Sequence, residues 1–478
     1  MSEDLGITTK KEEDINEWYR EVIKKSELAN YSAVSGCFVF RPLSYSIWEE
    51  IRKQVDRRFK DIGIENAYFP LFIPERFLAK EAEHFEGFTP EVAWVTETGS
   101  SELDEKLAVR PTSEAIMYDS YNDWIRSWRD LPLRLNQWNN VVRWEFKHAT
   151  PFLRTREFLW NEGHNAYASE EEARKDGDKV LDAYQTVCED YMAIPCVRGR
   201  KTEKEKFDGA IDTYSLEHVL PDGRAIQGPD YHYDGKNFAK AFDITYMDED
   251  GEEKYVHQST FAITTRQIGV MIMIHSDNRG LVIPPRLAPT KTVIVPIFNN
   301  EEDKEKVLSR AQEIKNELKD CKVDDREHRT PGWKFNEWEV RGIPLRIELG
   351  PREVENGEVT IVRRDNGEKT TVKTEKVREE VKKQIDEMHD SLFQKTKKFM
   401  EENTRETTSY DELKEIIEKK GGFVKAPWCG NQLCEDAIKD ETAAKITNIP
   451  EKYEKPEGEK CIYCGEEAKH WVHFAKSY

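Results

Sequence analysis

Apolar side chains recur along this chain with helical and strand periods in turn, and the alternation predicts where its elements lie. Between Ser46 and Phe59 an apolar residue returns every four positions with charged residues between, which predicts an amphipathic helix that ends near Gly63. The next apolar run, residues 67–73, predicts a strand. Its Pro70 is tolerated only at a sheet edge or where the hydrogen-bond ladder is interrupted.

Two more helices are predicted in the first half of the chain. Ser169 and Glu172 have the spacing of a capping box, in which both side chains satisfy free backbone amides at the start of a helix. Residues 268–274 are continuously apolar and follow a strand-like run that starts at Phe261, which predicts a strand leading into a buried helix. We therefore expect one large first domain over residues 1–288.

A different pattern begins around Pro289. An apolar strand over residues 292–298 precedes a helix. The apolar face of that helix carries Val307, Ala311, Ile314 and Leu318. Three further strands, separated by turn-forming Asn-Gly pairs, span residues 345–349, 359–363 and 370–373. Strands alternating with helices predict a compact α/β module over residues 289–385, and a helix from Val377 leads out of it into residues 386–478.

Four of the eight cysteines fall close together near the end of the chain. Cys429 and Cys434 form one chelating pair and Cys461 and Cys464 another, in a segment with little apolar sequence of its own. Two such pairs suit tetrahedral Zn²⁺, and binding of the metal can replace a missing hydrophobic core. The sequence predicts a closed, structural zinc site in residues 386–478. Two metal-free pairs of thiols are the alternative.

Composition and charge exclude some classes of protein. The longest apolar runs are far shorter than the roughly 20 residues that a membrane-spanning helix needs. The Met1-Ser-Glu-Asp start has neither a basic nor an apolar signal region, so we expect a cytoplasmic protein. The formal net charge of −20 argues against a protein that coats nucleic acid through bulk electrostatics. The charge does not exclude local RNA contacts, and the candidate cationic segments are residues 198–201 and 326–329.

Candidate nucleotide chemistry is concentrated between residues 142 and 162. Arg143 and Glu145 are two apart and would face the same side of a strand, while Arg154, Phe158 and Glu162 recur every four residues on a return strand. Arginine supplies a fork of donors for phosphate, and the phenyl ring supplies a face for a purine. The sequence therefore predicts an antiparallel nucleotide-binding hairpin.

This R-x-E … R-x-x-x-F-x-x-x-E arrangement resembles motif 2 of the class II aminoacyl-tRNA synthetases. The helix that ends near Gly63, with the proline-containing run after it, resembles motif 1, which forms the dimer interface in that family. The run from Phe261 to Arg266 and the apolar stretch after it resemble motif 3. The resemblance implies an α+β catalytic domain with an antiparallel sheet, ATP with Mg²⁺ as a substrate, and a homodimer.

Within class II, the chain resembles the prolyl-tRNA synthetases of archaea and eukaryotes over essentially its whole length. Thr112-Ser-Glu114 is similar to their T-x-E signature, and residues 332–339 and 350–352 are similar to their anticodon module. Arg266 follows Glu145 by 121 residues, too few for the editing insertion of the bacterial form. The resemblance implies three domains: the catalytic domain, an anticodon-binding α/β domain and a small zinc-binding C-terminal domain. It also implies that the chain ligates L-proline to tRNA(Pro) through prolyl-adenylate.

By position, the resemblance assigns substrate sites. The proline pocket comprises Thr112, Glu114, Arg143, Trp160, His164, His232 and Phe261. The ATP site comprises Arg143, Glu145, Arg154, Thr155, Phe158, Gln227, Thr264 and Arg266. The catalytic role falls to Arg143, Arg154 and Arg266, which offset charge on the α-phosphate and the leaving pyrophosphate. The family usually has threonine where this chain has Asp230, so Asp230 is left unassigned.

Anticodon recognition is assigned to Glu339, with Arg346 and Arg352 as secondary candidates. A carboxylate accepts from both donors on the Watson–Crick edge of guanine, and arginine donates to O6 and N7. The alternative for Glu339 is an ion pair on the surface of a helix, with Lys334 or Arg341 as its partner.

Two other functions stay open at this point. A synthetase-like paralogue would form an adenylate without charging tRNA, and a non-catalytic RNA-binding scaffold would need only zinc and the α/β module. The scaffold would not need Arg143, Arg154 and Arg266 together. For the enzyme, a pocket for a small ring discriminates weakly, since one methylene is worth about 1 to 3 kcal/mol. We therefore expect some activation of cysteine and alanine, with no editing domain to clear it.

Overall fold

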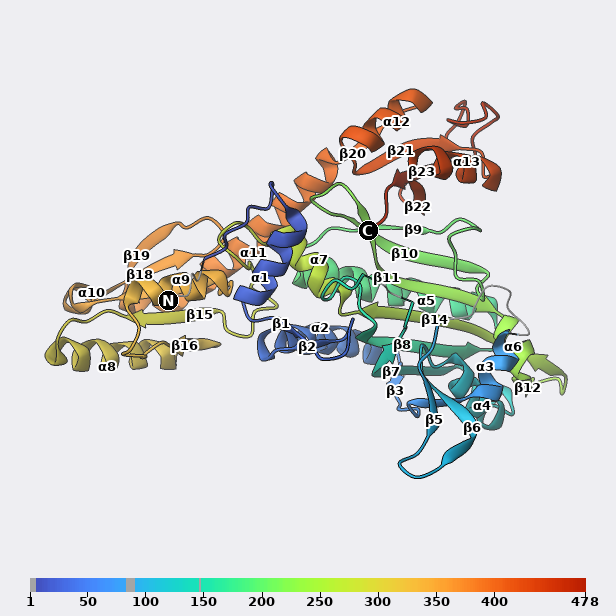
Figure 1. Cartoon of the computed structure of the whole chain (residues 1–478), viewed down its shortest axis with the longest axis horizontal. Coiled ribbons are helices and arrows are strands. Elements are labelled where there is room, and N and C mark those ends of the chain that lie inside the picture. Colours follow the sequence, from blue (N-terminus) through green and yellow to red (C-terminus); the bar gives the residue numbers. More distant parts are fainter. Residues whose placement is uncertain (1–5, 83–90, 146–147) are drawn as a thin grey trace.

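The computed structural model describes residues 6–82, 91–145 and 148–478. The Met1-Ser-Glu-Asp start, from which we expect no secretory signal, lies outside these ranges. Among the helices that are described, none is both long enough and apolar enough to cross a membrane. Figure 1 shows the second module at one end of the molecule and the third domain folded back over β9 and β10.

One long sheet runs through the first and third domains. Within the described residues it holds eleven strands in the order β20-β21-β23-β22-β9-β10-β11-β14-β8-β7-β3. The first-domain strands are β3 Glu65–Asn66, β7 Leu133–Val142, β8 Glu157–Tyr167, β9 Val197–Arg200, β10 Asp212–Val219, β11 Ala225–Gly235 and β14 His257–Thr264. From β9 to β7 every neighbouring pair is antiparallel, which confirms the antiparallel sheet expected for the catalytic fold.

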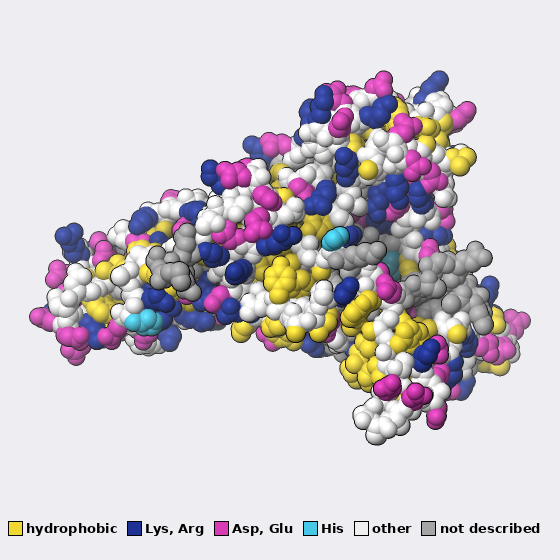
Figure 2. Space-filling model, in the orientation of Figure 1, with side chains coloured by type: hydrophobic (Ala, Val, Ile, Leu, Met, Phe, Trp, Pro, Cys, Tyr) yellow, Lys and Arg dark blue, Asp and Glu magenta, His cyan; other side chains and the backbone are white. Residues whose placement is uncertain are grey.

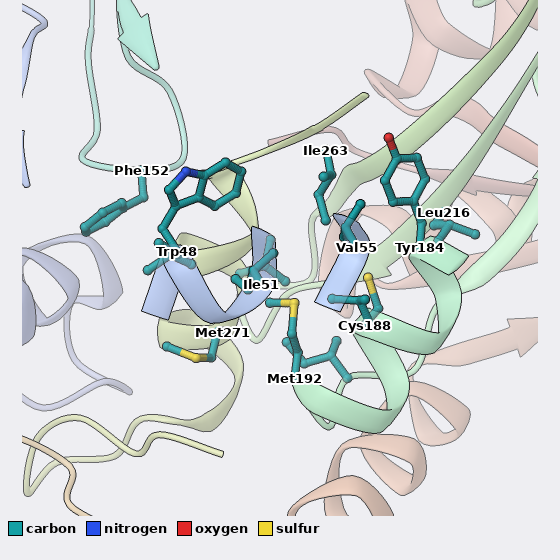
Figure 3. Packing of buried hydrophobic residues seen from close by; sticks show 14 of the residues in the cluster. Trp48, Ile51, Val55, Phe152, Tyr184, Cys188, Met192, Leu216, Ile263 and Met271 are labelled. Atoms are coloured by element: carbon teal, nitrogen blue, oxygen red, sulfur yellow. The ribbon is translucent and has the colours of Figure 1, made fainter. Parts of the chain in front are cut away.

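Three helices cover one face of this sheet and form the main hydrophobic core. They are α2 Pro42–Asp61, α5 Glu170–Thr186 and α7 Arg266–His275. Figure 3 shows Ile51 and Val55 of α2 among Met271 of α7, Cys188 beyond α5 and Ile263 of β14. The four-residue period therefore places the apolar face of α2 against the other helices.

The predicted start of α5 agrees with the structure, but only half of the capping box forms. The Ser169 hydroxyl accepts from the Glu172 amide at 3.3 Å and caps α5, whereas the Glu172 carboxylate accepts from Arg134 at 3.3 Å. Nearly all of α7 is buried, as its unbroken apolar run predicts, and it directly follows β14. The hydrophobic pattern therefore fixed both elements of the candidate motif 3.

The strand predicted over residues 67–73 is not continuous. β3 ends at Asn66 and pairs with β7, whereas β4, Phe72–Pro74, pairs with β6, Glu102–Val109, in a separate sheet with β5, Trp94–Glu97. Pro70 lies between the two strands, because it has no amide to donate to a ladder. The chain uses this proline to pass from one sheet to the next.

The second module has the expected α/β organisation. Its sheet order is β16-β15-β17-β18-β19, parallel across the first three strands and antiparallel after them. The strands are β15 Thr292–Pro296, β16 Cys321–Val323, β17 Leu345–Leu349, β18 Glu358–Arg363 and β19 Lys369–Lys373. The helices are α8 Glu301–Glu317, α9 Pro331–Val340, α10 Pro351–Asn356 and α11 Val377–Glu402. α11 spans the boundary expected at 385/386 and carries the chain into the third domain.

The third domain completes the long sheet. Its strands are β20 Thr404–Glu406, β21 Phe423–Trp428, β22 Lys445–Pro450 and β23 His470–Ala475, with helices α12 Tyr410–Lys419 and α13 Gln432–Thr442. β22 pairs with β9 of the first domain, where Ile449 faces Arg200 and Pro450 faces Gly199. The third domain therefore shares a backbone ladder with the first.

Candidate active site

The expected substrate residues meet in one cavity of about 340 Å³ on the open side of the long sheet. On β8 the side chains of Phe158, Trp160, Glu162 and His164 line it, as the two-residue period of a strand requires. Asn161, between them, is fully buried and donates to Asn136. The strand therefore divides its side chains between the cavity and the interior.

Fourteen different positions were expected to bind proline or ATP, and all but one line this cavity. They are Thr112, Glu114, Arg143, Arg154, Thr155, Phe158, Trp160, His164, Gln227, His232, Phe261, Thr264 and Arg266. Glu145 is the exception, since it is exposed and is not among the lining residues.

The hairpin that carries Arg143 and Glu145 differs from the prediction. β7 ends at Val142, and one further bond joins the Arg143 amide to the Arg156 carbonyl at 2.7 Å. The Trp144 amide then turns to Glu91 at 2.9 Å, so the ladder stops and Glu145 no longer shares a face with Arg143. Arg154 likewise precedes β8 and bridges to Thr150 in the connecting loop. Arg143 and Arg154 therefore lie in the loop that joins β7 and β8 rather than on the paired strands.

Arg143 lies in the cavity wall beside two aromatic rings. Its Nε donates to the Pro111 carbonyl at 3.1 Å. The guanidinium carbon lies 5.6 Å from the ring centre of Phe158 and 5.4 Å from that of Trp160. Trp160 is itself fixed, because its Nε1 donates to Asn139 at 2.6 Å. These contacts hold a cation at the wall of the cavity.

Arg266, at the start of α7, is held by backbone carbonyls. Its Nη1 donates to Gln227 at 3.2 Å and its Nε to Leu153 at 3.3 Å. Burial lowers the pKa of Arg266, and the nearby charges of Arg143 and Arg154 lower it further, while Asp230 opposes them. Three cations that converge on one cavity are suited to a polyanionic ligand.

Arg154 also contacts the end of the chain. Its Nη2 donates to the Tyr478 carbonyl oxygen at 3.4 Å. Tyr478 is held beside β11, since its amide donates to Ala225 at 2.9 Å and its ring lies 4.1 Å from the Arg224 guanidinium. The last residues of the third domain therefore reach the arginine side of the cavity.

Glu162 is the most heavily bonded residue of the cavity. Its carboxylate accepts from the Ser113 amide at 2.9 Å, from Gln137 at 3.1 Å and from Asn139 and His164. Burial alone would raise the pKa of Glu162, but hydrogen bonds led by that from His164 outweigh it and hold the pKa at about 2. Glu162 thus stays charged and fixes the turn that carries Thr112 and Glu114.

One part of the cavity wall is acidic and compact. Ligand atoms of Glu114, Glu162 and His164 all lie within 4.8 Å of one another. Thr112 donates its hydroxyl to Glu114, and Glu114 begins α4, Glu114–Trp124. Two buried carboxylates beside a hydroxyl are suited to a small cationic group such as an ammonium.

Asp230 and His232 lie together on β11 and line the same cavity. Gln227 donates to Asp230 at 2.8 Å, and His232 Nε2 lies 3.6 Å from the same carboxylate. Thr213 and His232 Nδ1 are 2.8 Å apart. Asp230, which the sequence left unassigned, therefore orients Gln227 and His232.

Phe261 differs from the other proline candidates, because its ring belongs to the main core. The ring packs edge-on against Phe59 of α2 with centres 5.3 Å apart. A Cβ on Gly163 would lie 1.9 Å from this ring, so the glycine of β8 makes room for it. The ring of Phe261 therefore supports the floor of the cavity from beneath.

Sequence reasoning missed several residues of the site. Ser113, Gln137 and Asn139 hold Glu162, and residues 205–207 form part of the cavity wall. Ser113 lies inside the T-S-E run, which was a usable signal. Gln137 and Asn139 had none, because their role depends on the pairing of β7 with β8.

The four clustered cysteines converge in the third domain. All four Sγ atoms lie within 4.8 Å of one another. Cys429 lies 3.7 Å from Cys434 and 3.7 Å from Cys464, measured between sulfurs. Tetrahedral zinc with bonds of about 2.3 Å places its sulfurs about 3.8 Å apart. Cys429, Cys434, Cys461 and Cys464 therefore fit a structural zinc ion.

The three anticodon candidates do not form one cluster. Arg346, on β17, donates to the Phe335 carbonyl of α9 at 3.4 Å, which places it beside the helix that carries Glu339. Arg352 lies on α10, beyond the other end of β17, and a strand of five residues is about 17 Å long. Glu339 pairs with Arg279 of the first domain at 2.9 Å, rather than with Lys334 or Arg341.

Comparison with known families covers all three domains. Profiles match the tRNA synthetase class II core domain (G, H, P, S and T) over residues 94–275, an anticodon binding domain over 291–384, and the C-terminal domain of prolyl-tRNA synthetase over 410–478. These matches agree with the predicted order of a class II catalytic domain, an anticodon module and a C-terminal domain.

Similar proteins match over nearly the whole chain. A proline–tRNA ligase of Natranaerobius thermophilus is 50% identical over 98% of both chains, and one of Alkaliphilus oremlandii is 49% identical over 98% of both. The crystal structure of prolyl-tRNA synthetase from Cryptosporidium parvum, complexed with halofuginone and AMPPNP, is 44% identical with a TM-score of 0.94. That match covers 99% of this chain and 97% of the other.

Proposed function

This chain belongs to the prolyl-tRNA synthetase family of class II aminoacyl-tRNA synthetases, and we propose that the cavity described above carries out both steps of proline ligation to tRNA(Pro). The observation that carries the proposal is the charge pattern of the cavity: Arg143, Arg154 and Arg266 line it, and the ligand atoms of Glu114, Glu162 and His164 meet within 4.8 Å of one another in its wall. ATP and an amino acid need these opposite environments side by side.

In the first step, the carboxylate of proline attacks the α-phosphorus of ATP in line and pyrophosphate leaves. Class II synthetases use ATP with Mg²⁺ for this reaction. Arg143 offsets charge on the α-phosphate, while Arg154 and Arg266 offset charge on the leaving pyrophosphate. Phe158 offers its face to the adenine, with Thr155, Gln227 and Thr264 beside it. Glu145 is exposed, so it contacts ATP only where the adenine of the bound nucleotide extends out of the cavity.

The amino acid occupies the acidic end. Thr112 and Glu114 receive the secondary ammonium of proline, because a buried carboxylate in this position needs a cationic partner. Trp160, His164 and His232 enclose the ring, and Phe261 supports the floor. Glu162 holds Thr112 and Glu114 in place through the turn at Ser113. The tRNA terminal hydroxyl then attacks the activated carbonyl and releases AMP.

Charging of tRNA separates this enzyme from a paralogue that stops at the adenylate. Purified protein with ATP, Mg²⁺, labelled proline and tRNA(Pro) should give acid-precipitable prolyl-tRNA. Adenylate formation with no labelled tRNA would favour the paralogue. The absence of both prolyl-tRNA and adenylate would contradict the proposed function.

Anticodon recognition is proposed for Glu339 and Arg346, with Arg352 as a more distant candidate. E339A should lower the specificity constant for charging by about 1 to 3 kcal/mol and leave pyrophosphate exchange unchanged, because exchange requires no tRNA. R279A is the matched control, since it removes the ionic partner of Glu339 without removing the carboxylate. Equal losses in both variants would make Glu339 a contact between domains rather than a reader of guanine.

A homodimer through the motif 1 region is proposed as well. Exposed hydrophobic side chains gather there, and Figure 2 shows this apolar surface around β1, Ala29–Tyr31, and β2, Phe38–Phe40. The exposed residues are Tyr31, Val39, Tyr45, Tyr68, Phe72 and Trp94. Exposed apolar side chains gathered in this way are typical of a protein interface. Sedimentation should give twice the mass of one chain.

Two further proposals concern subtype and setting. The zinc-type C-terminal domain and the short distance from Glu145 to Arg266 favour the archaeal and eukaryotic form without an editing insertion. We place the enzyme in the cytoplasm, where ribosomes consume prolyl-tRNA.

A further inference from the structure

A short loop between β9 and β10 forms one wall of the amino-acid end of the cavity. Residues 202–207 turn directly after the buried Lys201, and Glu205, Lys206 and Phe207 line the cavity. The Phe207 ring lies 5.0 Å from the His232 ring, measured between centres. The Phe207 amide donates to the Thr213 hydroxyl at 3.0 Å, and that hydroxyl also contacts His232. The position of this loop therefore sets one side of the proposed proline pocket.

The outer side of the same loop is held by α13 of the third domain. The buried Thr202 hydroxyl donates to Glu435 at 2.9 Å, and Lys204 forms an ion pair with Asp436. Glu435 and Asp436 directly follow Cys434, one of the four clustered thiols. The contacts therefore leave from the turn of α13 that the cysteine cluster anchors.

A second set of third-domain contacts fixes Glu205. Its carboxylate accepts from Lys445 of β22 at 2.5 Å and lies 3.7 Å from Lys439 of α13. The side chain of Glu205 is only 11% exposed, so these lysines are needed to balance a largely buried charge. Glu205 is thus both a wall of the cavity and an anchor to the third domain.

The root of the loop is anchored by the same domain. Lys201 is buried, and its Nζ donates to Glu217 of β10 at 2.6 Å and to the Thr447 carbonyl of β22 at 2.7 Å. Four of the five residues from Lys201 to Glu205 therefore contact α13 or β22, and the fifth, residue 203, is exposed.

We propose that the third domain positions residues 202–207 against the proline pocket, so that order at the four-cysteine cluster is transmitted through α13 to amino-acid binding. The inference rests on the proposed placement of proline in this cavity. Lys204, Glu205, Asp436 and Lys445 are positioning residues, because they act through the loop and not on the reacting atoms. The loop contacts His232, which is proposed for proline, so the effect is expected on proline binding rather than on ATP binding.

The test removes the third-domain partners and leaves the loop intact. The variants are D436N, K445M and their combination, and D440N is the control because it removes a carboxylate from the exposed side of the same helix. Each ion pair of this kind is worth about two- to fivefold in an equilibrium, so the double variant should raise the KM for proline about tenfold in pyrophosphate exchange. The KM for ATP and kcat should stay within about twofold of wild type. D436E, which keeps the charge, should stay near wild type.

Hydrogen exchange of the peptide that spans residues 202–207 gives a readout independent of activity. It should be faster in the double variant, and faster in wild-type enzyme treated with a zinc chelator, but unchanged in D440N. Unchanged loop exchange in the double variant would overturn the coupling, as would equal rises in the KM for proline and for ATP. If wild-type enzyme shows no pyrophosphate exchange with proline, the proposed function fails. Hydrogen exchange of residues 202–207 still decides whether the third domain is coupled to the loop.

Discussion

Arg143 links the cavity wall to the proposed chemistry at the scale of a single residue. Its Nε is bonded to the Pro111 carbonyl, and its guanidinium lies against Phe158 and Trp160. A planar cation held in this way keeps its orientation before substrate arrives, so little reorganisation is needed as charge develops on the phosphate.

R143A should lower pyrophosphate exchange by about 100-fold or more, because a preorganised donor to a developing charge is worth about that much. Circular dichroism should be unchanged. R156A is the matched control, since Arg156 lies in the same hairpin but donates to Ser35 and packs over Trp144. Near-normal exchange in R143A would contradict the assignment of motif 2.

Much of the cavity could be predicted at this scale, and what was missed has a common cause. Residues that carry a family signature, such as Thr112 and Arg266, line the cavity as expected. The network around Glu162 was not predictable, because its donors come from β7, β8 and the turn before α4. Which residues donate to Glu162 depends on the pairing of distant segments, and the periodicity of a single segment does not predict that pairing.

At the scale of elements, apolar periodicity was sufficient where one segment packs against a core. α2, α5 and α7 lie where their patterns placed them, and Ser169 caps the start of α5. The hairpin was less predictable, because the bond from Trp144 to Glu91 that ends its ladder involves a residue far along the chain. The same limit applies to Pro70, where the sequence allowed either an edge strand or an interruption.

One zinc ion per chain is expected at the four cysteines, and C461S should lose it. The segment between β21 and β23 should then exchange hydrogen faster, because metal binding contributes to its folding. C321S is the matched control, since Cys321 lies in β16 of the second module, away from the cluster. Elemental analysis that finds no zinc in wild-type protein would remove this claim.

The junction of the first two domains has a predictable pH dependence. Arg364 donates both Nη groups to Asp277, at 2.9 and 2.7 Å. Burial alone would raise the pKa of Asp277, but hydrogen bonds and charge from Arg364 outweigh it and hold the pKa below its usual value. A depressed pKa means that the pair stabilises the fold above the unfolded pKa of about 3.9 and loses this effect as pH falls further.

D277N should therefore melt at a lower temperature than wild type at pH 7, and the difference should shrink as pH falls below about 4. Thermal scans at several pH values measure it. A difference that stays constant down to pH 3 would show that the Asp277 carboxylate does not titrate as argued.

At the scale of the whole molecule, the long sheet was the least predictable feature. The pairing of β22 with β9 joins segments about 250 residues apart, and Lys201 adds its bond to Thr447 at the same place. The three domains were each recognisable from sequence, but their arrangement depends on such distant contacts. This arrangement brings α13 to the wall of the cavity and Tyr478 to Arg154.

The central claim is that one cavity activates proline, and pyrophosphate exchange measured with each of the twenty amino acids tests it most directly. Proline should give the largest kcat/KM, with weaker exchange for cysteine and alanine, because a pocket for a small ring rejects side chains of similar volume by only about 1 to 3 kcal/mol. Undetectable exchange with cysteine at saturation would contradict the size argument alone. Maximal exchange with another amino acid, or none with proline, would contradict the account itself.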